Sequence, residues 1–228
     1  MELFKYDIHV HTDEVSPCGK IEAEKMVKLY KKAGYAGVVI TDHFRSRFFT
    51  DINTGISHEE KVDRYLLGYR KAKKLGDKMG IKIFWGLEIT FPENSNDYLV
   101  YGINEEILNK YRNITEIGLA EFYKLMKKIN EDILIFQAHP FRTGTTIMDP
   151  ELLDGIEIYN GNPRHDSRNE LALKFAQRHG LRKISGSDFH QLEDLGQGGI
   201  ILPEKPETEA DLVQMLKKEK IRNLLTTV

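Results

Sequence analysis

Residues 7–12 read DIHVHT, and they follow directly on an apolar run near the start of the chain. We therefore predict a strand over residues 4–10, FKYDIHV. Side chains two positions apart on a strand point to the same face, so His9 and His11 are expected to project side by side. What this pair of imidazoles holds depends on the residues that the rest of the chain brings to it.

Short apolar runs rich in Val and Ile recur along the whole chain and alternate with amphipathic stretches of helical period. Continuous runs of this kind are typical of strands that are buried on both faces of a parallel sheet. The predicted strands after the first cover residues 37–41, 82–90, 97–103, 133–139, 155–160, 182–188 and 198–202. The predicted helices cover residues 22–34, 61–80, 115–130, 166–180 and 207–220.

The caps of these helices can be predicted as well. Thr115 is the expected N-cap of the third helix and Asp166 or Ser167 that of the fourth, whereas Gly80 and Gly180 are expected to end the helices before them. Repeated alternation of strand and helix indicates a parallel α/β fold in a single domain spanning residues 1–228. The alternation is compatible with an open doubly wound sheet and with a barrel. Residues 44–56 show no clear period and are expected to form a long loop over a site.

Composition excludes several classes of protein. The 228 residues are 40% hydrophobic and 30% charged, as in ordinary globular proteins, and the net charge of −2 offers no basic excess for long nucleic acids. The single cysteine excludes an internal disulfide framework. Because there is no apolar leader and no run of about 18 apolar residues, we expect a cytoplasmic protein without a membrane partner.

Metal-capable side chains stand at the ends of five predicted strands. They are His9 and His11, His43 in TDHF, Glu88 in GLEIT, His139 in FQAHPF, and Asp188 with His190 in SGSDFH. In parallel α/β folds the ligand site lies at the carboxyl ends of the strands, so these seven side chains are expected to converge. Mixed imidazole and carboxylate ligands suit Zn, Mn or Fe, and seven of them exceed the needs of one four-coordinate ion. We therefore predict two or three divalent transition-metal ions.

The ordered motifs DIHVHT, ITDHF, GLEIT, AHP and GSDFH resemble those of the PHP family, named for polymerase and histidinol phosphatase. The resemblance extends from about Tyr6 to Leu202. It implies a distorted (β/α)7 TIM-like barrel and a metal-dependent phosphoesterase with a cluster of up to three ions. It also implies that His9, His11, Glu88 and Asp188 hold the first ion, and that Glu88 bridges to a second ion bound by His139.

By the same resemblance His43 and His190 hold a third ion, but the chain departs from the family pattern at the residue that would complete this site. HTDEVSPCGK stands where the family has an SDG-like turn or a nearby His. Glu14 is the expected replacement, with Cys18 and Asp13 as alternatives. Glu88, Asp188 and His190 are also the predicted catalytic residues.

The predicted reaction is hydrolysis of a small phosphorylated substrate, such as histidinol phosphate or a nucleotide, by a metal-activated hydroxide. The predicted substrate-binding residues lie beside strand ends and are Arg142, Arg164, Asn160 and His165. The alternatives are exonuclease-like hydrolysis of short oligonucleotides, cleavage of C–N bonds as in amidohydrolase-like barrels, and a non-catalytic barrel stabilised by metal. The oligomeric state is left open.

Overall fold

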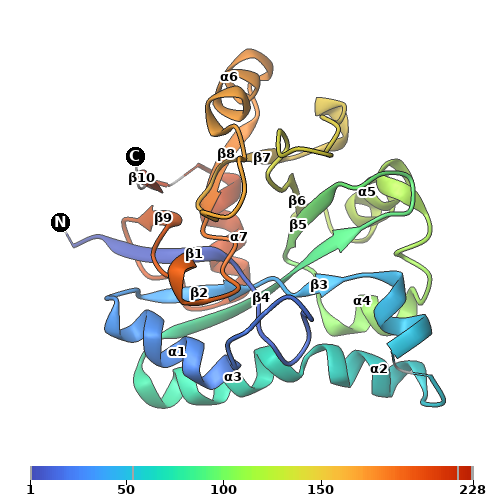
Figure 1. Cartoon of the computed structure of the whole chain (residues 1–228). Coiled ribbons are helices and arrows are strands. Elements are labelled where there is room, and N and C mark those ends of the chain that lie inside the picture. Colours follow the sequence, from blue (N-terminus) through green and yellow to red (C-terminus); the bar gives the residue numbers. More distant parts are fainter. Residues whose placement is uncertain (1, 53, 220, 227–228) are drawn as a thin grey trace.

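A computed structural model describes residues 2–52, 54–219 and 221–226. Ten strands form one strongly curved sheet, in the order β10-β9-β1-β2-β4-β5-β6-β7-β8, with β3 paired to β4 (Figure 1). The strands are β1 (Phe4–Val10), β2 (Gly37–Ile40), β3 (His43–Phe44), β4 (Lys82–Thr90), β5 (Asp97–Tyr101), β6 (Leu134–Gln137), β7 (Gly155–Asn160), β8 (Arg182–Gly186), β9 (Gly198–Leu202) and β10 (Asn223–Thr226).

The sheet is nearly closed, which confirms the predicted barrel and excludes the open doubly wound alternative. Val10, at the end of β1, forms a parallel bridge with Phe189, just after β8. The alternation of strands and helices predicted a parallel sheet, but the observed sheet is mixed. β5 is antiparallel to β4 and β6, and β9 is antiparallel to β1 and β10. An apolar run shows that a strand is buried but not which way it runs.

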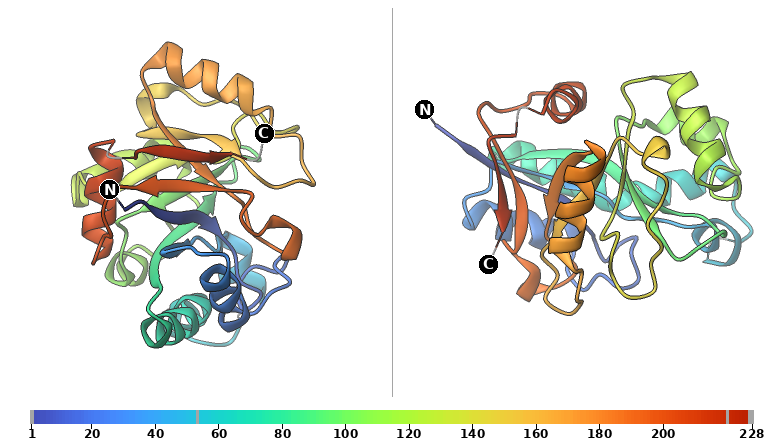
Figure 2. Two further views of the ribbon diagram at one scale, coloured as in Figure 1. Left: turned by 90° about the vertical axis from the view of Figure 1, so that its left-hand side faces the viewer. Right: turned by 90° about the horizontal axis from the view of Figure 1, so that it is seen from above.

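Helices cover the outside of the barrel. In Figure 1, α1 (Ala23–Lys32) and α3 (Leu67–Met79) lie side by side beneath β2 and β4, and α6 (Asn169–His179) packs on β7. Figure 2 shows the same barrel from the side and from above. The other α-helices are α2 (His58–Tyr65), α4 (Glu105–Lys110), α5 (Gly118–Ile129) and α7 (Glu209–Lys217). Predicted residues 61–80 thus form two helices, and α4 was not predicted.

Helix ends agree with the sequence where glycine sets them. Gly80 and Gly180 end α3 and α6 in the left-handed conformation, at φ 65° and 64°. The predicted N-caps are wrong. Ile117 rather than Thr115 precedes α5, and Arg168, the residue after Ser167, precedes α6.

The segment predicted as a loop over residues 44–56 is anchored in part by buried aromatic side chains. It contains the end of β3 and a π-helix over Phe48–Ile52. Phe44 and Phe48 are buried and pack edge-to-face on Tyr65. Asn53 lies outside the described residues. Aromatic burial therefore fixes this segment beside the site.

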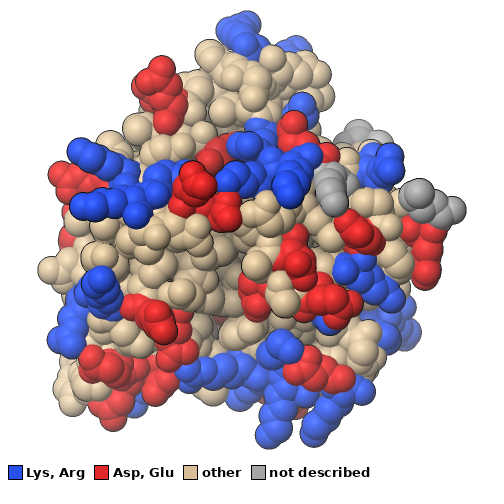
Figure 3. All heavy atoms as spheres, turned by 180° about the vertical axis from the view of Figure 1, so that it is seen from behind, with Lys and Arg blue, Asp and Glu red and all other residues tan. Residues whose placement is uncertain are grey.

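The barrel interior is apolar below the site. One buried cluster takes side chains from β1, β2, β4, β5, β6, β8 and β9, and α7 packs against it through Leu212 and Leu216. Acidic and basic side chains are interspersed on the face opposite to that of Figure 1 (Figure 3). Within residues 2–52, 54–219 and 221–226, no helix has the length and apolar composition needed to cross a membrane.

Candidate metal centre

The seven predicted ligands meet at one edge of the barrel. His9 and His11 come from β1 and the residue after it, His43 from β3 and Glu88 from β4. The others follow β6 and β8 and are His139, Asp188 and His190. The rings of His9 and His11 lie side by side with centroids 5.2 Å apart, as the spacing in DIHVHT predicts.

Glu88 lies at the centre of the cluster and is fully buried. Its Oε1 is 3.2 Å from His9 Nε2 and 3.4 Å from His139 Nε2. Its Oε2 is 2.6 Å from His43 Nδ1 and 3.5 Å from His11 Nε2. The two oxygens thus face different imidazole pairs, which is the geometry of a carboxylate that bridges two ions.

Asp188 forms the second carboxylate of the cluster. Its Oδ1 is 3.4 Å from His9 Nε2 and 3.5 Å from His11 Nε2. The same oxygen lies 3.4 Å from His190 Nδ1. The ligand atoms of His9, His11 and Asp188 all lie within 4.8 Å of one another, close enough to share an ion.

Unsatisfied polar atoms concentrate in this cluster. Among the described residues, eight buried side-chain nitrogen or oxygen atoms have no hydrogen-bond partner, and six of these belong to His9, His11, His43, Glu88 and His139. Leaving one such atom unpaired costs about 1–3 kcal/mol. Divalent ions would satisfy the Nε2 atoms of His9 and His11 and both oxygens of Glu88 together, so the donor set fits a metal cluster.

A second layer of residues orients the imidazoles. Glu157 Oε1 is 2.9 Å from His9 Nδ1, and Ser16 Oγ is 3.2 Å from His11 Nδ1. The Nδ1 of His190 is 2.8 Å from the Asp188 carbonyl oxygen. In each case the bonded Nδ1 leaves Nε2 to face an ion, an arrangement found repeatedly around histidine ligands.

Charges within the cluster favour the ligand forms of both carboxylates. Burial alone would raise the pKa of Glu88, but the neighbouring His43 and His9 hold it well below its usual range. Burial would also raise the pKa of Asp188, but its interactions with His9 and His11 outweigh burial and lower the pKa. Both groups therefore stay ionised at neutral pH, as metal ligands must.

The imidazoles differ in their preferred charge. Burial, followed by the positive charges of His190 and His43, lowers the pKa of His11 well below 6.5. Burial also opposes protonation of His9, but Glu157, Asp188 and Glu88 outweigh it and raise its pKa. An ion at the site must therefore displace a proton from His9, whereas His11 is already neutral.

Two ligands have an uncommon backbone conformation. His139 has φ 30° and Asp188 has φ 53°, in the left-handed region that non-glycine residues seldom adopt. Each lies two residues after a strand, where its side chain joins the cluster. Backbone strain of this kind is typical of functional sites.

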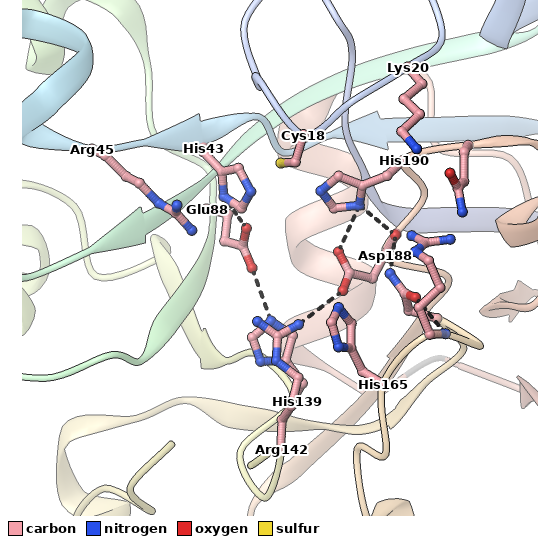
Figure 4. Close-up of a pocket in the computed structure, with 13 residues that line it drawn as sticks. Cys18, Lys20, His43, Arg45, Glu88, His139, Arg142, His165, Asp188 and His190 are labelled. Atoms are coloured by element: carbon pink, nitrogen blue, oxygen red, sulfur yellow. Dashed lines mark hydrogen bonds and ion pairs between the residues drawn. The ribbon is translucent and has the colours of Figure 1, made fainter. Parts of the chain in front are cut away.

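A cavity of about 330 Å³ opens onto the cluster and has a basic lining (Figure 4). Of the predicted substrate-binding residues, Arg142, Arg164 and His165 line it. Arg142 lies between two carboxylates, with Nη1 3.6 Å from Asp188 Oδ2 and Nη2 3.9 Å from Asp97 Oδ2. Arg45 lines it too, as does Lys20, which was not predicted to bind substrate.

Two predicted site residues take other roles in the structure. Asn160 is buried and donates from Nδ2 to Glu157 Oε2 at 2.9 Å, so it supports the second layer and does not line the cavity. Glu14 accepts a hydrogen bond from the Ala23 backbone at 3.0 Å and pairs with Lys71 at 3.2 Å. In the structure both oxygens of the Glu14 carboxylate are thus engaged at the start of α1 and by Lys71.

Cys18 lines the cavity instead, with its sulfur facing His43 and His190 (Figure 4). Cys18 is an exposed residue. Partial desolvation of its thiol raises the pKa, but hydrogen bonds with the two imidazoles and their charge outweigh this and lower it to about 6. Of the three residues proposed to complete the third site, Cys18 is therefore the one that the structure brings to the cluster.

Three buried carboxylates belong to the site but were not predicted. Glu157 holds His9, Asp42 accepts 2.7 Å bonds from Thr12 and Ser16, and Asp97 lies beside His139. Ligand atoms of Asp97, His43 and Glu88 lie within 4.8 Å of one another. The available signal was a charged residue within or beside an apolar strand, as in GIEIYN.

Solved structures share this fold at low sequence identity. A two-domain protein from Bacteroides vulgatus, containing a predicted PHP-like metal-dependent phosphoesterase, aligns with TM-score 0.68, 18% identity and 96% of this chain covered. The chain covers 64% of that protein's length. PsfC from Pseudomonas syringae aligns with TM-score 0.68 and 16% identity, over 100% of this chain and 93% of its own.

A more distant fold match is an amidohydrolase from Chromobacterium violaceum with bound sulfate and no metal. It aligns with TM-score 0.51 and 16% identity, over 95% of this chain and 96% of its own. No curated protein matches the sequence significantly. The family model of the PHP domain, however, matches residues 7–225. The chain therefore belongs to the PHP domain family.

Proposed function

We propose that the protein is a metal-dependent phosphoesterase that hydrolyses a small phosphomonoester. The observation that carries this proposal is the position of a basic cavity directly over a cluster of imidazoles and carboxylates. Lys20, Arg45, Arg142 and Arg164 all line a space that also contains Glu88 and Asp188. Four cationic side chains above a metal centre suit a dianionic substrate group.

We infer sites for two ions, and the third is taken up in the next subsection. His9, His11 and Asp188 would hold the first, with Glu88 Oε1 beside them. His139 and the Oδ2 atom of Asp97, 3.9 Å apart, would hold the second with Glu88. When bound, such ions supply a nucleophilic hydroxide at neutral pH and neutralise charge on the phosphoryl group.

The protein's own side chains would position the ester. Arg142 points its guanidinium between Asp97 and Asp188, where its planar fork can bind two phosphoryl oxygens. Arg164 is held in place by a bidentate ion pair with the buried Asp194, so it presents a fixed edge to the cavity. His165 lines the same cavity, and burial lowers its pKa, so it is neutral at pH 7 and able to accept a proton or hydrogen bond.

The size of the cavity favours a small substrate. A volume of about 330 Å³ lies at the lower end of the range for small-molecule sites. The net charge of −2 also argues against a long polyanion. A phosphorylated metabolite such as histidinol phosphate, or a mononucleotide, is therefore a better candidate than a nucleic acid strand.

The test combines metal analysis with a substrate comparison. Protein purified without chelator is analysed for ions per chain, then assayed with Zn²⁺, Mn²⁺ or Fe²⁺ on p-nitrophenyl phosphate, histidinol phosphate, bis(p-nitrophenyl) phosphate and a short oligonucleotide. We expect two or three bound ions and hydrolysis of the monoesters that EDTA abolishes and added metal restores. Glu88→Gln should remove activity, whereas the exposed Glu151→Gln should retain it.

Two results would contradict the proposal. Protein that binds no metal, even after metal is added, would indicate a non-catalytic barrel. Preferential cleavage of the diester and the oligonucleotide would indicate the exonuclease-like alternative instead.

A further inference from the structure

Three imidazoles of the cluster form a group of their own on the side nearest residues 12–20. The ligand atoms of His11, His43 and His190 lie within 4.8 Å of one another. The ring of His11 stacks on His190 at 4.2 Å and lies 4.4 Å from the ring of His43. His11 is fully buried, and its Nε2 has no hydrogen-bond partner although Ser16 engages its Nδ1. Three nitrogen donors are one fewer than a tetrahedral site requires.

The loop of residues 12–20 places a sulfur atom beside these three imidazoles. In Figure 4 the Cys18 sulfur points between His43 and His190. The turn that carries Cys18 is fixed to the site, because Lys20 N donates to the His190 carbonyl oxygen at 2.8 Å and Gly19 N donates to the Ser16 carbonyl oxygen at 2.8 Å.

Gly19 is required for this turn. A Cβ atom at position 19 would lie 2.9 Å from the Thr12 carbonyl oxygen and 3.1 Å from that of Ser16. Both contacts are with backbone, which cannot move aside, so a larger residue would push the turn outward. The glycine therefore allows the backbone to approach closely enough for its neighbour Cys18 to reach the imidazoles.

We propose that Cys18 ligates a third ion through its thiolate, together with His43 and His190 and with His11 Nε2 in reach. This inference rests on the proposed function, since it adds an ion to the same cluster. It replaces a carboxylate with a soft ligand, so this position selects Zn²⁺ or Fe²⁺ over Mn²⁺ and Mg²⁺. The metal sites of the cluster would then differ in their ligands. The sites at Glu88 and Asp188 have carboxylate oxygens, and the third site has a sulfur ligand.

The sequence makes this proposal unusually easy to test, because Cys18 is its only cysteine. Any thiolate-to-cobalt charge-transfer band in Co²⁺-loaded protein must therefore come from this residue. Metal-free protein is titrated with Co²⁺ while the near-ultraviolet absorbance and the number of bound ions are recorded. In parallel, the rate of thiol alkylation by iodoacetamide is measured with and without Zn²⁺, since Cys18 is exposed in the metal-free chain.

Wild-type protein should develop the band, bind three ions and lose at least tenfold in alkylation rate when Zn²⁺ is added. Cys18→Ser should lack the band and bind two ions. Cys18→His should also lack the band but recover the third ion through nitrogen. The matched control is Glu14→Gln, which removes the competing carboxylate and should leave both the band and three ions in place.

Absence of the band, together with an alkylation rate that Zn²⁺ does not change, would overturn the thiolate assignment. Three bound ions in Cys18→Ser would overturn it as well. If the wild type binds two ions and hydrolyses phosphomonoesters without the band, only this inference fails. If it binds none, the proposed function fails with it.

Discussion

Glu157→Gln should weaken metal binding although the residue touches no ion. Glu157 is buried, and its two oxygens accept three hydrogen bonds, each 2.9 Å long. Oε1 takes the bond from His9 Nδ1, and Oε2 takes those from the His139 backbone N–H and Asn160 Nδ2. The substitution preserves size but replaces one of these acceptors with an NH₂ group.

The hydrogen-bond count decides which way the new amide lies. With its oxygen in the Oε2 position it keeps two of the three bonds, and with its oxygen in the Oε1 position it keeps one. The difference of one bond is worth about 1 kcal/mol, so the first orientation is preferred. The amide nitrogen then faces His9 Nδ1, which must become an acceptor. The imidazole proton moves to Nε2, the atom that would otherwise bind metal.

Loss of such a partner typically lowers metal affinity by about 10–100-fold. At about 1.4 kcal/mol per tenfold change, the ion is destabilised by roughly 1.4–2.8 kcal/mol. Competition between the protein and a fluorescent chelator for Zn²⁺ measures the dissociation constant directly. The thermal midpoint of the metal-free variant should change much less than that of the zinc-loaded variant, because two of the three hydrogen bonds persist.

The control is Glu151→Gln, an exposed carboxylate in the same stretch of chain. It removes the same charge without contacting an imidazole. If Glu157→Gln binds Zn²⁺ within twofold of the wild type, the tautomer argument is refuted. If Glu151→Gln weakens binding equally, the effect is long-range charge rather than orientation of His9.

Two further substitutions test the structure around the site. Burial raises the pKa of Asp7 to about 6, against hydrogen bonds from groups that include Ser187 and Tyr30. A raised carboxyl pKa means that the folded state binds the proton more tightly than the unfolded state. In the metal-free protein the Asp7 carboxyl should thus contribute a loss of stability on the order of 3 kcal/mol as pH rises from about 4 to about 6. In urea unfolding at several pH values Asp7→Asn should lack this loss, and equal pH profiles would contradict the assignment. Glu14→Gln weakens the acceptor at the start of α1 and the pair with Lys71, and should lower the free energy of unfolding by about 1 kcal/mol; an unchanged urea midpoint would refute this capping role.

The sequence predicted that the seven candidate ligands would converge, because each stands at or just after the carboxyl end of a strand. Asp97 was not predicted as a site residue because the direction of its strand was not predicted correctly. It is the first residue of β5, which would place it at the far edge of a parallel sheet. Because β5 runs antiparallel to β4 and β6, its first residue lies at the same edge as the last residues of those strands. Strand direction depends on tertiary pairing, which a single apolar run does not encode.

Helix starts failed for a similar reason. Thr115 was predicted to cap the third helix, yet α5 begins three residues later at Gly118. The side chain that accepts the Leu119 backbone N–H, at 2.9 Å, is Glu93, which is distant in sequence. A cap supplied from another part of the chain leaves no local signature. The sequence indicates Cys18 only as an alternative ligand, because the approach of its turn to His190 also depends on long-range contacts.

The left-handed backbone at His139 and Asp188 has an evolutionary consequence. At φ 30° and 53°, glycine would relieve backbone strain at both positions, so the side chains of His139 and Asp188 cost the fold stability. In a descendant of this chain without a functional metal centre, metal binding would no longer oppose the substitution of glycine at these two positions. We therefore expect relatives with a functional metal centre to retain His139 and Asp188, and relatives that have lost the centre to have glycine at these positions.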